Sequence, residues 1–402
     1  MKHLLVIVIA IIFSSLSAAT FYPVNDTKNI LKQIDENLVK YYLTELLKFA
    51  PRYTGSDTCK KAEEWAYNEF LSMGLDVKYF EWEMGGFQDR NIIATLPGDE
   101  YIVIVGAHID TVENAPGADD DGSGVAAVIS VAKVLSSYRF SHTVKFIIYS
   151  GEEVGAYGSY AHAKYSYENG DKILAVLDVD MVGYADSARG GNYIRFFEPE
   201  RSQWITEFSS YVAEKYYDLV GLNVEKVPNY PGADHQAYVD YGYDAIFMAH
   251  YDGYPYGHSP EDSIDKINFT YEMKATRFLA AVAIELANKD IPVYVQIVEP
   301  KEACLYILNH SIASISSQKW YTGIRGLTIV LGNVEVVVEV DGDVEKVIFA
   351  VDGRIWRWDY SPPYKWKINI FLFGKHRLEV YAYGEEVVKD EMDIFAIIPY
   401  LP

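Results

Sequence analysis

The segment YIVIVGAHID (Tyr101–Asp110) decides the fold, because an unbroken apolar run leads directly into a histidine and an aspartate. Similar short apolar runs occupy Val144–Tyr149, Ile173–Val179 and Ala245–Met248. Such runs are typical of strands that are buried on both faces of a sheet. Segments of helical character, such as Gly122–Tyr138, separate them. This alternation predicts an α/β domain with a mixed, largely parallel sheet sandwiched by helices.

Two segments upstream of this region also show apolar residues at helical spacing. They are Asn29–Phe49 and Thr58–Met73, and Gly74 is a suitable stop for the second. We therefore expect a helix over each segment.

The pattern changes after about residue 290. Valine occupies every second position from Val334 to Val340, and the run ends at the turn dipeptide Asp341-Gly342. Further strands are expected at Lys346–Val351, Trp366–Phe373 and His376–Tyr383. Short strands at regular spacing predict a C-terminal all-β, immunoglobulin-like sandwich over residues 292–402, preceded by the α/β domain over residues 20–291.

The N-terminus has the pattern of an export signal. A basic start, Met1-Lys2-His3, is followed by an apolar run of ten residues from Leu4 to Phe13 and by small residues up to Ala19. Ten residues are too few to span a bilayer, which takes roughly 20. The sequence predicts a signal peptide over residues 1–19 and a secreted, extracellular chain without a membrane span in its mature form.

Composition excludes some partners. The 402 residues include 35 Lys plus Arg and 57 Asp plus Glu, so the formal net charge is −22. Such a surface repels nucleic acids, which we therefore do not expect as ligands. The two cysteines, Cys59 and Cys304, are too few for a thiolate metal cluster, and an inter-domain disulfide and two free buried thiols both stay open.

Charged and imidazole side chains follow each apolar run of the α/β domain. They are His108 and Asp110, Glu152 and Glu153, Asp178 and Asp180, and His250 and His258. Ligands of open α/β sheets bind at the carboxyl ends of the strands, so these side chains should meet in one crevice.

A crevice that gathers carboxylates needs a cation, because the carboxylates would otherwise repel one another. Histidine and carboxylate ligands suit Zn²⁺ and related divalent ions. Each residue taken alone also has a structural explanation. Asp119–Asp121 could cap a helix, Glu152-Glu153 could be a solvated first turn, and a single histidine is usually structural.

Several motifs together resemble a known family. They are GAHIDTV (Gly106–Val112), APGADDDGSG (Ala115–Gly124), SGEEVGAYGS (Ser150–Ser159), LDVDMVGY (Leu177–Tyr184) and HSPEDSID (His258–Asp265). In order and spacing they resemble the secreted di-zinc aminopeptidases of the bacterial leucyl aminopeptidase type, whose superfamily includes glutamate carboxypeptidase and glutaminyl cyclase. The resemblance covers roughly residues 29–289 and implies the zinc exopeptidase fold.

The resemblance implies two Zn²⁺ ions per chain, bridged by Asp120. His108 and Asp180 would complete one site, and Glu153 and His258 the other. Asp110 would orient the imidazole of His108.

The resemblance also implies three catalytic residues, of which Asp110 is one. Glu152 would be the general base, which takes a proton from the water between the metals and delivers it to the leaving amine. Tyr230, in NYPGADH (Asn229–His235), matches a loop that places a tyrosine hydroxyl at the oxyanion in part of the family. His235 would belong to a structural Asp-His pair.

These features predict a secreted metallo-exopeptidase that removes N-terminal residues from peptide substrates. Glutaminyl cyclase needs one zinc, so the complete second ligand set disfavours it, and carboxypeptidase action stays an alternative. A receptor-like ectodomain without activity is disfavoured because such relatives usually lose these ligands. In the C-terminal domain, we expect Trp356 and Trp358 to pack the sandwich or the domain interface, and a protein- or carbohydrate-binding platform is the alternative.

Overall fold

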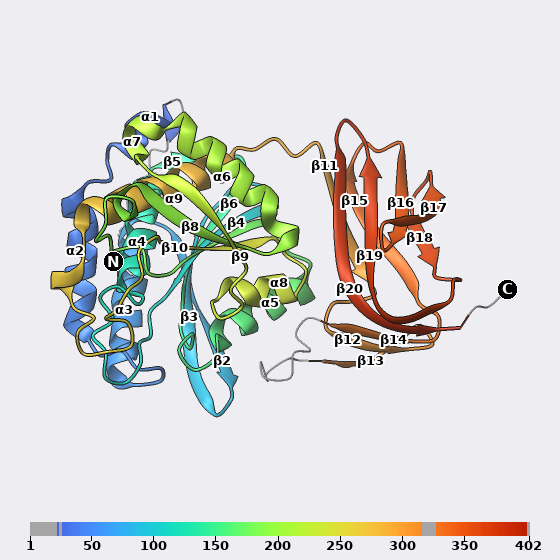
Figure 1. Ribbon diagram of the computed structural model, residues 1–402, viewed down its shortest axis with the longest axis horizontal. Helices are drawn as coiled ribbons and strands as arrows, with labels where there is room; N and C mark the ends of the chain where they lie inside the picture. Colours follow the sequence, from blue (N-terminus) through green and yellow to red (C-terminus); the bar gives the residue numbers. More distant parts are fainter. Residues whose placement is uncertain (1–21, 24–25, 316–326, 400–402) are drawn as a thin grey trace, which may run out of the picture.

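The computed structural model describes residues 22–23, 26–315 and 327–399. Figure 1 shows an α/β part that is joined to an all-β part. The predicted signal peptide over residues 1–19 lies outside the described residues.

In the described part of the chain, eight strands form one mixed sheet in the order β2-β3-β6-β4-β7-β10-β8-β9. The four central strands, β6, β4, β7 and β10, run parallel, whereas β2, β3 and β8 form antiparallel pairs. The strands are β2 (Asp76–Met84), β3 (Phe87–Leu96), β4 (Tyr101–His108), β6 (Thr143–Tyr149), β7 (Lys172–Val179), β8 (Tyr193–Glu198), β9 (Asn223–Pro228) and β10 (Ala245–His250). A short parallel pair joins β1 (Tyr22–Pro23) to β5 (Tyr138–Arg139). The predicted fold class is confirmed.

Helices cover both faces of this sheet. They are α1 (Thr27–Leu31), α2 (Glu36–Leu46), α3 (Asp57–Ser72), α4 (Gly122–Leu135), α5 (Tyr157–Asn169), α6 (Gln203–Lys215), α7 (Tyr217–Val220), α8 (His235–Asp240) and α9 (Phe269–Ala287). Short 3₁₀ helices lie at Leu47–Phe49, Gly190–Asn192, Glu200–Ser202 and Ile264–Lys266. In β4, Val103 and Val105 belong to the core beneath α2, α3, α4 and α9, and Ile102 and Ile104 to the core beneath α5 and α8. Burial on both faces explains why this strand is apolar throughout.

One of the two upstream helix predictions is confirmed and one is wrong. The segment 58–73 matches α3, and Gly74 follows it with a φ of +80°. The segment 29–49 is broken, because α1 ends at Leu31 and α2 begins at Glu36. Asp35 starts the second helix, since its side chain accepts a hydrogen bond from the backbone N–H of Leu38.

The all-β part contains two sheets around one core. Among its described residues, β11, β15 and β18 form one sheet, and the other has the order β13-β12-β14-β20-β19-β16-β17. The strands are β11 (Val293–Glu299), β12 (Cys304–Ile307), β13 (His310–Ser314), β14 (Thr328–Leu331), β15 (Glu335–Gly342), β16 (Lys346–Val351), β17 (Arg354–Asp359), β18 (Tyr364–Lys367), β19 (Leu372–Tyr383) and β20 (Val387–Ile398). The all-β character is confirmed, whereas the immunoglobulin-like topology and the boundary at residue 292 stay predictions.

Details of this part differ from the sequence-based expectation. The strand expected at 366–373 is wrong, because β18 ends at Lys367 and β19 begins at Leu372. Trp356 and Trp358 lie at the surface of β17, where they are 36% and 50% exposed. The expectation that these two side chains pack inside the sandwich is therefore wrong. Cys59 and Cys304 are both free and buried.

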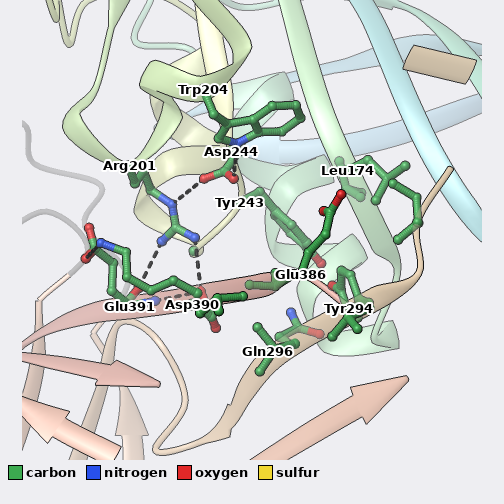
Figure 2. Close-up of a pocket in the computed structure, with 18 of the residues that line it drawn as sticks. Leu174, Arg201, Trp204, Tyr243, Asp244, Tyr294, Gln296, Glu386, Asp390 and Glu391 are labelled. Carbon is green, nitrogen blue, oxygen red and sulfur yellow. Dashed lines mark hydrogen bonds and ion pairs between the residues drawn. The ribbon is translucent and has the colours of Figure 1, made fainter. Parts of the chain in front are cut away.

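The junction between the two parts contains a cavity of about 540 Å³. Figure 2 shows Arg201 at its wall, in ion pairs with Asp244 at 2.9 Å and Asp390 at 3.2 Å. A third hydrogen bond of the guanidinium goes to the carbonyl oxygen of Glu391. Asp244 precedes β10 and Asp390 lies on β20, so this arginine joins the two parts.

Arg201→Ala should destabilise the junction by about 3–5 kcal/mol, because the change leaves two largely buried carboxylates without their cation. Arg377 is the matched control, since it also bridges the two parts, through Glu200 at 2.9 Å, but lies at the surface. Arg377→Ala should cost only about 0–1 kcal/mol. Urea unfolding of both variants measures the difference, and equal losses would contradict the assignment.

Candidate functional site

The predicted site residues lie where the parallel strands end. The strand β4 ends at His108 and β10 at His250, and the loops after β6 and β7 carry Glu152 and Asp180. Because the central strands are parallel, these ends meet at one edge of the sheet.

Asp120 lies between two histidines. Its Oδ1 is 3.5 Å from Nε2 of His108, and its Oδ2 is 3.1 Å from Nε2 of His258. The His108 nitrogen is also 3.7 Å from Oδ1 of Asp180, and the His258 nitrogen is 3.0 Å from Oε2 of Glu153. The five predicted ligands therefore form two groups that share one carboxylate.

Three atoms of these groups are buried and find no hydrogen-bond partner in the described ranges. They are Nε2 of His108, Oδ1 of Asp180 and Oε1 of Glu153. Buried polar atoms are normally satisfied, so an orphaned imidazole nitrogen beside orphaned carboxylate oxygens needs a partner. Nitrogen and oxygen donors of this kind fit divalent cations such as Zn²⁺.

Electrostatics supports the same interpretation. Burial raises the pKa of Asp180 to about 6, and the charge of Asp120 adds to this shift. Hydrogen bonds to Asp120 and Glu153 raise the pKa of His258 to about 10. Burial also raises the pKa of Glu152 well above its ordinary value. A cation in the crevice would lower these pKa values, because it favours ionised carboxylates and neutral imidazoles.

Asp121 also lies near His108, but its carboxylate is occupied. It accepts hydrogen bonds from the backbone N–H groups of Gly124 at 2.9 Å, Met181 at 3.0 Å and His108 at 3.2 Å. Asp121 thus caps α4 and ties this helix to the ends of β4 and β7. Asp120, whose oxygens face the histidines, is the better bridge between the two groups.

Sequence reasoning assigned no role to Asp262, which positions the acidic loop. Its Oδ1 accepts from the backbone N–H of Asp119 at 2.8 Å, and its Oδ2 from that of Asp120 at 3.2 Å. The motif HSPEDSID contains this residue, but its role depends on a contact across 142 positions. His250 pairs with Asp119 at 3.0 Å behind the ligands.

Asp110 organises the loop that carries the two glutamates. Its carboxylate accepts from the backbone N–H groups of Gly151 at 2.8 Å, Glu152 at 3.2 Å and Glu153 at 3.2 Å. It also accepts from the hydroxyl of Thr54 at 2.7 Å. Nδ1 of His108 is closer to the backbone oxygen of Asp110, at 3.0 Å, than to its carboxylate, at 3.7 Å.

A cavity of about 550 Å³ opens in front of the ligands. Glu152 lines it, and Oε2 of this residue lies 4.0 Å from Nε2 of His108. Tyr230 also lines it and is 55% exposed. His235 lies outside it, where its backbone N–H donates to Asp178 at 2.9 Å.

Two groups of candidate ligands that share a carboxylate, beside a further carboxylate, are an arrangement typical of metal-dependent hydrolases. Residues 91–283 match the model of peptidase family M28.

Curated relatives and solved structures agree with this assignment. A probable leucine aminopeptidase of Arthroderma otae is 29% identical over 294 residues, which cover 66% of this chain and 77% of the relative. The crystal structure of LapB from Legionella pneumophila is 26% identical with a TM-score of 0.60 and covers 67% of this chain and 78% of that chain. BSAP, a zinc aminopeptidase from Bacillus subtilis, shares the fold at 16% identity with a TM-score of 0.58, over 64% of this chain and 96% of its own.

Asp110→Asn should lower kcat/KM for a chromogenic peptidase substrate by about 10–100-fold, because the amide nitrogen replaces one of the two oxygens and cannot accept the backbone N–H bond from Glu152 or Glu153 that this oxygen receives. Thr54→Val removes a single hydrogen bond to the same carboxylate and serves as the control. Its effect should be smaller than that of Asp110→Asn. Wild-type activity in Asp110→Asn would show that the loop does not depend on this carboxylate.

Proposed function

We propose that this protein is an exported metallo-aminopeptidase that hydrolyses the N-terminal residue of peptides at a centre of two zinc ions. The observation that carries the proposal is the position of Asp120, whose two oxygens face the side chains of two different histidines. A carboxylate in this position suits a pair of cations better than one. The curated relatives named leucine aminopeptidase support the choice of the N-terminal bond.

In this proposal His108 and Asp180 hold one ion, and Glu153 and His258 hold the other, with Asp120 shared. Bound zinc would lower the pKa of the attacking water and polarise the scissile carbonyl. The orphaned Nε2 of His108 and Oδ1 of Asp180 support the first of these sites.

Glu152 is the proposed general base. Its side chain lines the cavity, and its backbone N–H donates to Asp110, which fixes the backbone from which the carboxylate extends. A carboxylate at this position can accept a proton from water and then release it. The proton would pass from the water to Glu152 and from Glu152 to the leaving amine.

Tyr230 is the proposed donor to the oxyanion. Its ring lies beside an aromatic pair, Phe197 and Phe247, at centroid distances of 6.2 and 6.4 Å. Gly232 leaves room for it, because a Cβ at that position would lie 2.6 Å from the tyrosine ring. The surrounding residues thus favour a ring position at the cavity, from which the hydroxyl can donate a hydrogen bond.

The walls of the cavity suggest the substrate class. Val154, Met181 and Phe247 line it together with the carboxylates. An apolar wall beside the catalytic groups suits an apolar N-terminal side chain, such as the leucine in the names of the relatives.

Export is proposed from the segment over residues 1–19 alone. Across the described ranges, the helices are too short or too polar to cross a membrane. The exposed Trp356 and Trp358 support a contact of the C-terminal part with protein or carbohydrate.

Glu152→Gln should reduce kcat by about 10²–10⁴-fold while zinc content stays unchanged, because the amide cannot accept the proton. Glu113→Gln, at an exposed position, is the matched control and should behave as the wild type. Steady-state kinetics and metal analysis on the same samples measure both quantities. Full activity in Glu152→Gln would refute its role as the base.

A panel of chromogenic amides should show cleavage of leucine derivatives with a free α-amino group and none of N-acetyl-leucine derivatives. Removal of metal with a chelator should abolish cleavage, and added zinc should restore it. Cleavage of N-blocked peptides from the C-terminus would instead indicate a carboxypeptidase. Cyclisation of N-terminal glutamine with one zinc would indicate a glutaminyl cyclase.

A further inference from the structure

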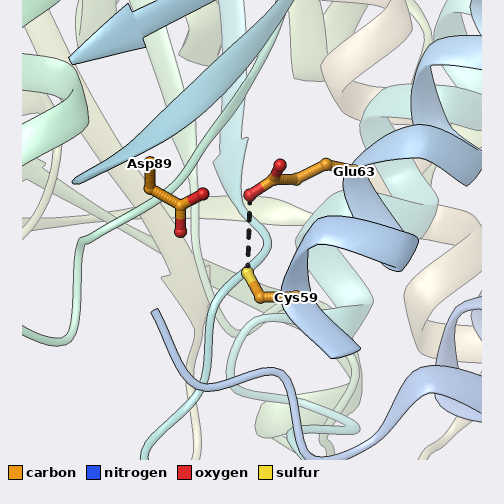
Figure 3. A group of neighbouring side chains, drawn as sticks. All are labelled: Cys59, Glu63 and Asp89. Atoms are coloured by element: carbon orange, nitrogen blue, oxygen red, sulfur yellow. Dashed lines mark hydrogen bonds between the residues drawn. The ribbon is translucent and has the colours of Figure 1, made fainter. Parts of the chain in front are cut away.

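A third group of potential ligand atoms lies away from the catalytic crevice. Cys59, Glu63 and Asp89 are all buried, and one ligand atom of each lies within 4.8 Å of the others. Cys59 and Glu63 are four positions apart on α3 and so share one face of the helix, with Sγ 3.7 Å from Oε1. Asp89 lies on β3, and Figure 3 shows its carboxylate directed toward that of Glu63.

Asp89 contributes a buried oxygen that lacks a partner. The residue is only 4% exposed, and its Oδ2 accepts from the backbone N–H of Gly55 at 2.7 Å. Its Oδ1 finds no hydrogen-bond partner within the part of the chain that the structure describes. Leaving a buried carboxylate oxygen unsatisfied is unfavourable, so this atom indicates a missing ligand.

The charges of the cluster also require a further positive species. Arg90 donates from Nε to Oε2 of Glu63 at 2.7 Å and supplies one positive charge for two carboxylates. The buried Arg52 is a second positive charge near Cys59, but its guanidinium donates to the backbone carbonyls of Ile109, Pro116 and Gly117. Either a proton or a metal cation must neutralise the second carboxylate.

We propose that Cys59, Glu63 and Asp89 bind a third divalent cation, of the zinc type, in a structural site. The thiolate favours zinc over magnesium or calcium, and both carboxylates are ordinary zinc ligands. With Cys59 ionised, the three negative ligands are balanced by one Zn²⁺ and the guanidinium of Arg90. Binding releases the thiol proton and the carboxyl proton to solvent, so acid weakens it.

The position of the site gives the cation a structural role. It would join α3 to β3, and Asp89 also holds the backbone of Gly55. The neighbouring Thr54 donates to Asp110, which positions the two glutamates of the crevice. The third cation would therefore stabilise the loop behind the catalytic centre without contacting the substrate.

Zinc content of the full-length protein tests the proposal. After saturation with zinc and dialysis, the wild type should retain one more ion per chain than Cys59→Ser. Cys304→Ser, which changes the other buried thiol, should retain the wild-type number. Cys304→Ser should also keep peptidase activity under native conditions, because this residue lies in the all-β part, away from the proposed catalytic groups. An equal zinc content in Cys59→Ser and wild type would overturn the proposal.

Cobalt spectroscopy gives a second test that does not depend on the folding of Cys59→Ser. The proposed catalytic ligands contain nitrogen and oxygen only, so a thiolate-to-cobalt charge-transfer band in the near ultraviolet can arise only from a cysteine site. The band should appear in the cobalt-substituted wild type and persist in Cys304→Ser. Its absence would mean that Glu63 and Asp89 share a proton instead, and it would leave the two-ion catalytic centre unaffected.

Discussion

Mutual repulsion among the carboxylates at the carboxyl edge of the central sheet is the constraint on which the rest of this structure depends. The structure limits this repulsion by giving several of these carboxylates backbone N–H donors. Asp121, Asp110 and Asp262 each accept two or more such bonds. Hydrogen bonds to the ionised form offset the cost of burial. Asp120 and Asp180 keep oxygens directed toward histidine nitrogens instead, and this difference separates the positioning residues from the proposed ligands.

The arrangement of the two parts keeps the cavity of the α/β domain open. β7 and β10 begin at the junction with the all-β part, where Leu174 and Asp244 line the cavity of Figure 2. The same strands end at the proposed catalytic centre. The residues that line the cavity of the candidate site all precede residue 259, so the all-β part contributes none of those in the described chain. Its attachment at the opposite edge leaves access to the crevice and places the exposed tryptophans of β17 away from the junction.

Much of the fold could be predicted because it depends on local patterns. The buried strands are apolar along their whole length, and α4 begins after the acidic run that ends at Asp121. Predictions were wrong where the apolar pattern continues across a point at which one helix or strand ends and the next begins. The segment 29–49 is apolar at helical spacing throughout, yet Asp35 caps a new helix within it. The segment 366–373 was expected to be one strand, although it ends one strand and begins another.

The candidate site also combines features that local sequence patterns predict with features that they do not. The residue types and their order after the strands could be read from motifs, because a parallel sheet brings strand ends together. By itself, the sequence determined the alternation of strands and helices, the acidic composition and the set of candidate donors. Only the tertiary structure decided that Asp120 faces both histidines, that Asp262 holds the acidic loop and that Asp89 meets Cys59 and Glu63. These contacts join distant positions, and they depend on side-chain direction and burial, which no local pattern specifies.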